Sequence, residues 1–438
     1  MTIAAEDPRK EKGRGRRRLF RAFLGCGFFV LVLVTIAALI IVPKTIDEPP
    51  FEAADLELAI PEIPSGENAA TAFMEIWKDG VPKLPTDNER DIAFWDAAEA
   101  GELLAALEAD PEIREGYWEP TIRMLERIDE AAQLPQFQFP VLMTIDGDGS
   151  HLGALKDTIE ANWFRAHWLL EKGERAHLLQ VYESWARFSA QLSSGVLDSV
   201  AFIISIANCG SLCGSLSKHL PETTGDLHTL LAQLDGIQHD RTQVSDTLRV
   251  EFQTFRNTLA DPEFALTEGR SFVERWLFLP HQTERIYGEH LRAAIVEGEK
   301  TGRVTRDLEV PDLDGLWDAL RVGNVIGWSV IGLMAVADDR MYRRAGIANS
   351  ALRATQLMVA LVIYEEQHGE LPAQLDALVP GILPAVPLDP FDGKPIRYDR
   401  ERRIVWAVGE DGVDGGGVGE PGSWRDADIV VAIPQRAP

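Results

Sequence analysis

The residues with the clearest chemical potential lie near the C-terminus, in a loop rich in aspartate and glycine. Four carboxylates surround the run Gly415–Gly416–Gly417: those of Asp411, Asp414, Asp426 and Asp428. Calcium binds six to eight hard oxygen atoms from carboxylates, backbone carbonyls and water. Glycine also lets the backbone turn so that carbonyls face inward. The pattern predicts a calcium site with these four aspartates as ligands. The alternative is an exposed cluster of Asp/Gly turns that binds no ion.

A long helix and a small sheet are the elements that would position this loop. Residues 347–367 carry an apolar stripe at helical spacing, and His368–Gly369 ends the helix because glycine suits a left-handed C-cap. Three later segments have the character of strands: Ile396–Tyr398, Arg403–Val408 and Asp428–Ile433. We therefore expect residues 345–438 to form a small α+β domain with one long helix and a short antiparallel sheet.

Four short pieces follow one another in this region: His368–Gly369–x–Leu371–Pro372, Asp389–Pro390, Gly409–x–Asp411–Gly412 with Gly415–Gly416, and Asp426–Ala427–Asp428–Ile429. In that order they resemble the C-terminal half of the major pseudopilin of type II secretion. The resemblance implies a loop that binds calcium and folds around it. Asp411, Asp426 and Asp428 are the matched ligands, and Asp414 and Glu420 are candidates by position alone.

The N-terminus has the pattern of a membrane anchor. Residues 1–21 hold eight basic and three acidic side chains, and residues 22–42 contain no charged residue. A helix of this length spans roughly 30 Å, the thickness of a bilayer core. The basic flank predicts a cytoplasmic N-terminus and a periplasmic remainder, in a single-pass protein of the inner membrane. A cleaved signal peptide is the alternative, but the apolar run is long for one.

A second alternative concerns the same segment. Gly27–Phe28, after the basic residues, resembles the cleavage point of a prepilin leader. Pilins carry a glutamate at the fifth mature position, where this chain has Val32. A divergent pseudopilin that is processed at Gly27 would therefore depart from the family at a residue used in filament assembly.

The chain between the anchor and the C-terminal domain has the pattern of a helical array. Residues 43–65 are rich in proline and acidic residues and predict an extended linker. Residues 66–344 predict an irregular array of antiparallel helices, with one turn at Glu171–Lys172–Gly173–Glu174. The apolar run Gly323–Ala337 is short for a second membrane span, so we expect a buried helix there.

Composition and motifs narrow the range of functions that the sequence allows. The net charge is −26 although residues 1–21 are basic, so the rest of the chain repels phosphates and nucleic acid is excluded as a partner. The sequence has no Gly-x-Ser-x-Gly, phosphate-binding loop, dinucleotide fingerprint or His-Glu-x-x-His, so we do not expect an enzyme.

Helical arrays more often hold partners than perform chemistry. We therefore predict a mainly α, membrane-anchored scaffold with a calcium-stabilised, pseudopilin-like tail. We expect protein partners in the envelope, near secretion or pilus-like machinery. An extracytoplasmic hydrolase in the helical body is the remaining alternative.

Overall fold

A computed structural model describes most of the chain outside its N-terminus. The described residues are Thr35, Val42, 46–78, 80–84, 88–141, 148–260, 277–305, 308–311, 322–334, 338–420 and 428–435. The basic segment 1–21, the cleavage point at Gly27 and nearly all of the predicted membrane helix 22–42 lie outside these residues. The chain divides into two compact units, a smaller one with residues 1–52, 259–287 and 308–335, and a larger one with the remainder.

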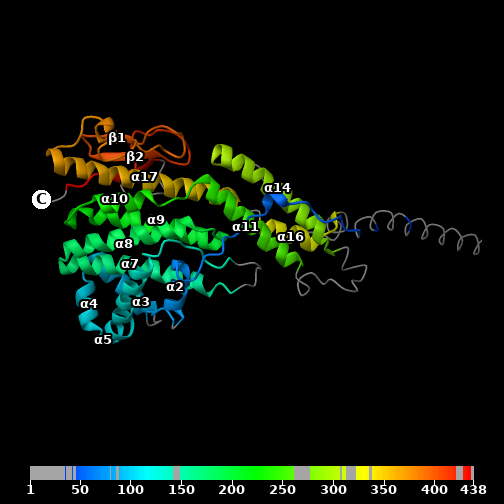
Figure 1. Ribbon diagram of the computed structural model, residues 1–438, viewed down its shortest axis with the longest axis horizontal. Coiled ribbons are helices and arrows are strands. Elements are labelled where there is room, and N and C mark those ends of the chain that lie inside the picture. Colours follow the sequence, from blue (N-terminus) through cyan, green and yellow to red (C-terminus); the bar gives the residue numbers. More distant parts are fainter. Residues whose placement is uncertain are drawn as a thin grey trace, which may run out of the picture. The chain divides into compact units, whose positions relative to one another are not determined.

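The larger unit is mainly helical, as the sequence predicts (Figure 1). Its α-helices are α2 (Ala69–Trp77), α3 (Asn88–Ala100), α4 (Leu103–Ala109), α5 (Pro111–Ile113), α6 (Glu119–Ala131), α7 (Ser150–Lys172), α8 (Arg175–Ser194), α9 (Ser199–His219), α10 (His228–Asp235), most of α11 (Arg241–Ala260), the later part of α14 (Pro280–Thr301) and α17 (Asp338–His368). Short turns of other helix types are η2 (Ala54–Leu56), η3 (Arg114–Trp118), η4 (Leu220–Glu222) and η5 (Leu375–Leu378).

The predicted turn between two long helices is present. Gly173 ends α7 in the left-handed region at φ 68°, and the amide of Glu174 returns to the carbonyl of Leu169 at 3.1 Å. Only glycine adopts this conformation without steric cost, which explains why the chain reverses here. Asp198 then caps α9 by accepting the amides of Val200 and Ala201 at 3.0 and 2.9 Å.

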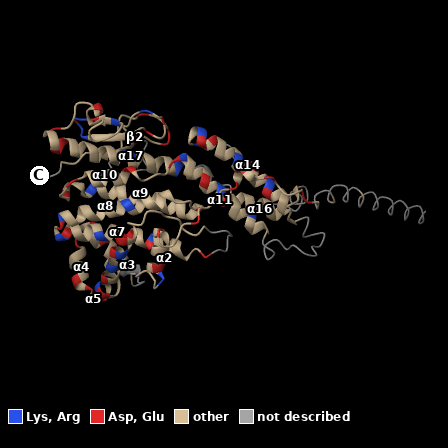
Figure 2. Ribbon diagram, in the orientation of Figure 1, with Lys and Arg blue, Asp and Glu red and all other residues tan. Residues whose placement is uncertain are grey.

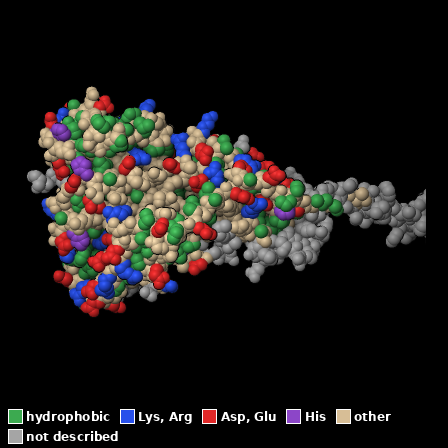
Figure 3. Space-filling view, viewed as in Figure 1, with side chains coloured by type: hydrophobic (Ala, Val, Ile, Leu, Met, Phe, Trp, Pro, Cys, Tyr) green, Lys and Arg blue, Asp and Glu red, His purple; other side chains and the backbone are tan. Residues whose placement is uncertain are grey.

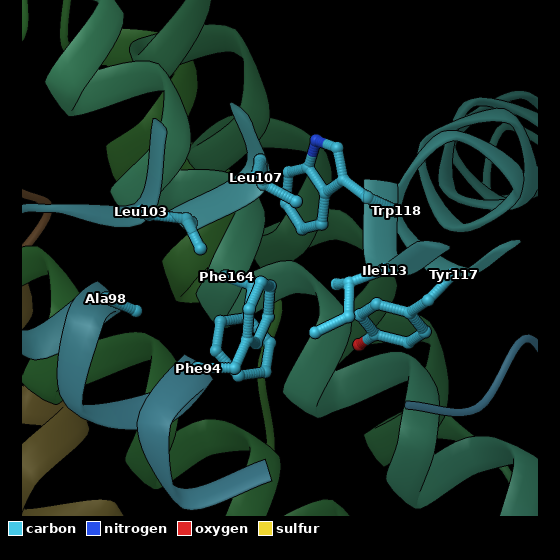
Figure 4. Packing of buried hydrophobic residues seen from close by; sticks show 8 residues of the cluster. All are labelled: Phe94, Ala98, Leu103, Leu107, Ile113, Tyr117, Trp118 and Phe164. Carbon is cyan, nitrogen blue, oxygen red and sulfur yellow. The ribbon is translucent and has the colours of Figure 1, made fainter. Parts of the chain in front are cut away.

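An aromatic cluster holds the first helices of the larger unit against α7 (Figure 4). Phe94 of α3 is at its centre, with ring centroids 4.9 Å from Phe164 and 6.0 Å from Tyr117. Leu103 and Trp118 close the cluster from α4 and η3. Buried aromatic side chains contribute large apolar areas, so short helices that could not be stable alone are fixed by this packing.

The C-terminal tail, residues 369–438, follows α17 and contains the sheet. Its strands are β1 (Arg397–Asp399), β2 (Ile404–Val408) and β3 (Asp428–Ala432), in the order β1-β2-β3, and both pairs are antiparallel. The predicted strands and the predicted helix end at His368 are confirmed within a residue or two. Helix α17 begins earlier than predicted, at Asp338.

Helix α17 joins the tail to the helical body. It packs against α9 and α10 and also against β2 and β3 (Figure 1). Every residue from Leu357 to Ile363 is at most 2% exposed. The expected boundary between residues 344 and 345 therefore falls inside a continuous helix, and the tail docks on the body.

The described part of the expected linker is also docked. Ala53 and Leu56 are buried. Asp55 accepts Arg292 Nη2 at 2.6 Å, and Glu57 accepts Arg256 Nη1 at 2.7 Å. The segment therefore differs from the extended spacer that its composition predicts, because its acidic residues meet arginines that lie about 200 positions later in the chain.

Two helices of the described chain are long and apolar enough to cross a membrane by length and composition. These are Ser199–Glu222 and Arg340–His368, of which 50% and 78% is buried inside the fold. Such burial is typical of core helices. Lys, Arg, Asp and Glu are spread along the helices (Figure 2), and both signs are interspersed with apolar side chains on the face in Figure 3.

The smaller unit holds the start of α14 and all of α16 (Val325–Met334). The apolar run that we expected as a buried helix does form a helix. However, its burial is incomplete: Ile331 and Gly327 are buried, whereas Val325, Trp328 and Val330 are only half-buried.

Candidate functional site

The aspartate-rich loop follows β2 and leads back to β3. We call residues 409–420 the Gly-rich loop. The loop opens with a turn in which Asp411 Oδ1 accepts the amide of Val413 at 3.0 Å. Gly412, at φ 68°, supplies the left-handed residue of this turn. Asp411 therefore holds its own turn together at an exposed position.

Asp428 is the buried carboxylate of this region. It is the first residue of β3 and is fully buried. Its Oδ1 accepts the amide of Gly415 at 3.2 Å, and its Oδ2 accepts the amides of Gly417 and Val418 at 2.8 and 3.0 Å. A carboxylate that accepts several backbone amides is a strong, charge-assisted acceptor. Asp428 therefore holds the Gly-rich loop in place by accepting hydrogen bonds from the backbone amides of that loop.

Two glycines are required for this arrangement. A Cβ at Gly415 would lie 2.7 Å from Asp428 Oδ2, so a side chain would displace the carboxylate. Gly417 has φ 69°, and a Cβ there would lie 3.0 Å from the Trp406 ring. We expected the glycines to turn carbonyls towards a cation. In the structure they turn amides towards an anion.

Arg397 lies at the centre of a second group of carboxylates, which we call the Arg397 cluster: Asp389, Asp392 and Asp414. Its Nη1 donates to Asp389 Oδ2 at 2.6 Å, its Nε donates to Asp414 Oδ2 at 3.3 Å, and its Nη2 donates to Asp392. Arg397 is 12% exposed, so the guanidinium is largely removed from water. One fixed cation thus links the 389–393 turn, β1 and the Gly-rich loop.

Burial, hydrogen bonds and neighbouring charges shift the pKa values of the three aspartates in the Arg397 cluster. Burial raises the pKa of Asp389. The amides of Phe391 and Val408 and the charge of Arg397 act in the opposite direction but do not outweigh burial. Burial is the largest influence on Asp392 and would raise its pKa, but the hydrogen bond and charge of Arg397 together with the amide of Lys394 outweigh it, so the pKa is lowered. The indole N–H of Trp406, followed by the amide of Gly416, lowers the pKa of Asp414. Asp392 and Asp414 are thus held as anions by their donors.

The structure separates the predicted calcium ligands. Asp414 belongs to the Arg397 cluster, Asp428 accepts backbone amides, and Asp411 holds a local turn. Asp426 lies outside the described residues. Within the described ranges, no three Asp, Glu, His or Cys side chains are gathered as a metal ion would need. The described carboxylates therefore accept hydrogen bonds from N–H groups. They do not by themselves supply the six to eight oxygen ligands that calcium requires.

Of the Arg397 cluster, only Asp414 was among the predicted site residues. Asp389 was quoted only as part of the Asp389–Pro390 piece. The available signal was the Asp389–Pro390–Phe391–Asp392–Gly393 turn directly before a strand that begins with arginine. This local pattern does not show which carboxylates Arg397 contacts, because Asp414 lies 17 positions after Arg397 in the sequence.

No family model, curated protein or solved structure matches this chain. The likeness of the tail to the major pseudopilin therefore rests on the sequence pieces alone. The helix followed by a small antiparallel sheet is observed, whereas membership of that family stays a prediction.

The helical body was searched for hydrolase chemistry. Two serine–histidine hydrogen bonds occur in the described part of the helical body, Ser205 to His239 at 2.9 Å and Ser215 to His219 at 3.4 Å. None of the four residues is more than 5% exposed. A substrate could not reach either hydroxyl, and a nucleophile needs an accessible position beside its base. These pairs therefore stabilise the core.

The second pair belongs to a buried polar cluster of α7, α8 and α9. Tyr182 Oη lies 2.9 Å from His219 Nδ1, and the His219 ring is 4.6 Å from that of His167. Burial, with a smaller effect of His167, lowers the pKa of His219 to about 3. Burial alone lowers the pKa of His239 to about 4. Both imidazoles are therefore neutral at pH 7.

Two cavities lined by described residues have volumes above 500 Å³. One of about 800 Å³ lies beside α2 and α7 and is lined by Trp77, Lys78 and His151 among others. Burial lowers the pKa of His151, and Lys78 is paired with Glu75 at 3.0 Å. The other, of about 510 Å³, lies between α17 and residues 383–390. Ser150 and Asp157 also line the first cavity, but His151 Nε2 has no hydrogen-bond partner, so the histidine is not paired with a hydroxyl through this atom. The described lining of the second cavity contains no serine, threonine or cysteine.

Proposed function

We propose that this protein is a single-pass, membrane-anchored scaffold whose extracytoplasmic part binds protein partners in the envelope. The observation that carries the proposal is the shared helix α17, which packs against α9 and α10 on the body and against β2 and β3 of the tail. Body and tail belong to one compact unit. A single compact unit suits a protein that holds partners at fixed positions.

The polar chemistry of the described chain supports the same conclusion. The serine–histidine pairs are buried, and the carboxylates of the tail are held by Arg397 and by backbone amides. These groups stabilise structure and do not converge on a substrate. Calcium binding in the Gly-rich loop stays a prediction, as does the placement near secretion or pilus-like machinery.

Cross-linking in cells tests the scaffold. Val413 and Val418 are 61% and 69% exposed on the Gly-rich loop, so a photo-reactive amino acid at either position leaves the core intact. The matched position on the body is Val200 at the start of α9, which is 50% exposed. We expect adducts with envelope proteins of the secretion or pilus class. Membrane preparations that give no adduct at any of the three positions would contradict the proposal.

The anchor is tested separately. We expect the full chain to float with membranes after alkaline extraction, with the mass of its intact N-terminus. A mature chain that begins at Phe28 would instead support the divergent pseudopilin.

A further inference from the structure

Helix α16 has an unusual composition for the surface of an acidic protein. Its residues are Val-Ile-Gly-Trp-Ser-Val-Ile-Gly-Leu-Met, without a charged side chain. The hydroxyl of Ser329 donates to the carbonyl of Val325 at 2.9 Å, so the single polar side chain is satisfied within the helix. A helix that is apolar on all sides is normally buried in a core or in a membrane.

The protein covers only part of this helix. Ile326 is 37% exposed, and Val325, Trp328, Val330 and Met334 are half-buried. Val310 is also exposed and lies beside α16, since a Cβ at Gly332 would be 3.4 Å from its Cγ1. Among the described residues, four of the ten exposed large hydrophobic side chains belong to the smaller unit, namely Val42, Ile46, Val310 and Ile326. Ile326 and Val310 thus mark an apolar surface at α16 that the described chain leaves uncovered.

The start of α16 is fixed to the start of α14. Asn324 is fully buried, and its Oδ1 accepts the amide of Leu279 at 2.7 Å. Its Nδ2 donates to Thr283 Oγ1 at 3.0 Å. Gly327 packs so closely on Thr283 that no side chain would fit. These contacts hold the two helix starts together within the smaller unit.

The start of α14 is in turn held by the segment that follows the predicted anchor. Asp47 accepts the amides of His281 and Gln282 at 3.1 and 3.0 Å, as a cap supplied from a distant part of the chain. The Glu48 carboxylate accepts Arg285 Nη2 at 3.0 Å. We call these contacts the anchor clasp.

The length of the chain places the anchor clasp near the bilayer. The predicted membrane helix ends at Val42, and Asp47 follows five residues later. Five residues span at most about 18 Å when fully extended. The start of α14, and with it the start of α16, therefore lies within about 20 Å of the end of the apolar segment.

We propose that α16 lies on the outer surface of the bilayer and contacts lipid through Ile326 and its apolar neighbours. This inference rests on the membrane anchor of the proposed function. Ten residues reach roughly 15 Å, about half of the hydrocarbon core, so α16 is an interfacial helix and not a second span. Lipid replaces the protein cover that the helix lacks.

An environment-sensitive fluorophore on the full chain tests the inference. The label is attached to Ile326→Cys, or to Val413→Cys as the matched exposed control, in a Cys26→Ala background. Cys209 and Cys213 stay because both are buried, and the background chain measures their residual labelling. The chain is reconstituted in phosphatidylethanolamine–phosphatidylglycerol vesicles, with a nitroxide on the lipid or with iodide in the buffer.

We expect the label at 326 to be quenched severalfold more by the lipid nitroxide than the label at 413, with a blue-shifted emission. Equal quenching at both positions, or quenching at 326 by iodide alone, would overturn the inference while the anchor stands. Failure of the unlabelled chain to float with the vesicles would overturn the anchor itself, and the inference with it.

Discussion

The guanidinium of Arg397 lies 2.6 Å from the carboxylate of Asp389, and neither side chain has more than 12% of its surface exposed. The same guanidinium also reaches Asp392 and Asp414. A protein cation thus pairs with Asp414, one of the four aspartates that the sequence predicted as calcium ligands, and with two carboxylates outside that set. This one side chain, on β1, thus holds both the 389–393 turn and the Gly-rich loop.

Loss of Arg397 should destabilise the tail strongly. We expect Arg397→Met to cost about 3–5 kcal/mol, because the buried Asp389 loses its partner while its charge stays desolvated. Arg400→Met is the control, since Arg400 pairs with Glu370 at 2.6 Å on an exposed surface and should cost less than about 1 kcal/mol. Urea unfolding measures both changes. Equal costs would show that the Arg397 cluster contributes no more than a surface ion pair.

Asp428→Asn should loosen the Gly-rich loop without unfolding the sheet. The asparagine keeps one acceptor but points an N–H₂ group at backbone N–H groups, and we expect a loss of about 1–3 kcal/mol. Hydrogen exchange should become faster at Gly415, Gly417 and Val418. Asp411→Asn should leave these amides unchanged, because Asp411 accepts only from its own turn. Unchanged protection in Asp428→Asn would contradict this role of the carboxylate.

Calcium removal provides an independent test. We expect the tail to stay folded in a chelator, because Arg397 and backbone amides already serve the described carboxylates. Calorimetry with calcium, on the wild type and on Asp411→Ala/Asp426→Ala, then decides whether the loop binds the ion at all. Collapse of amide protection in β2 and β3 on chelation would instead make calcium the organising cation.

Mild acid should weaken the helical body. His219 and His239 have folded pKa values of about 3 and 4, against about 6.5 when unfolded. The unfolded chain therefore binds more protons between pH 4 and 6.5, and the free energy of unfolding falls as the pH drops through this range. We expect His239→Gln to make this slope shallower by up to about 1.4 kcal/mol per pH unit. His177→Gln, at an exposed side chain, should leave it unchanged; an identical slope in both variants would contradict the prediction.

The sequence predicted those features that depend on local chemistry. Gly173 and Gly369 end their helices as expected, and β2 was visible from its apolar run. The role of Arg397 was missed because its three carboxylate partners come together only in the folded chain. The docking of residues 53–58 was missed for the same reason, since Asp55 meets Arg292. The incomplete burial of α16 could not be predicted either, because an apolar run does not reveal what covers it.

The position of α17 between the helical body and the sheet limits the insertions and deletions that this protein can accept during evolution. A helix turns by about 100° and advances about 1.5 Å with each residue. One residue inserted into α17 would therefore rotate the side chains on one side of the insertion by about 100° relative to those on the other, so the helix could not keep its contacts with α9 and with the sheet along its whole length. Surface loops tolerate changes of length, but this helix should not. We expect its length to be fixed in descendants of this gene, and the tail to be inherited with the body instead of being exchanged as a module.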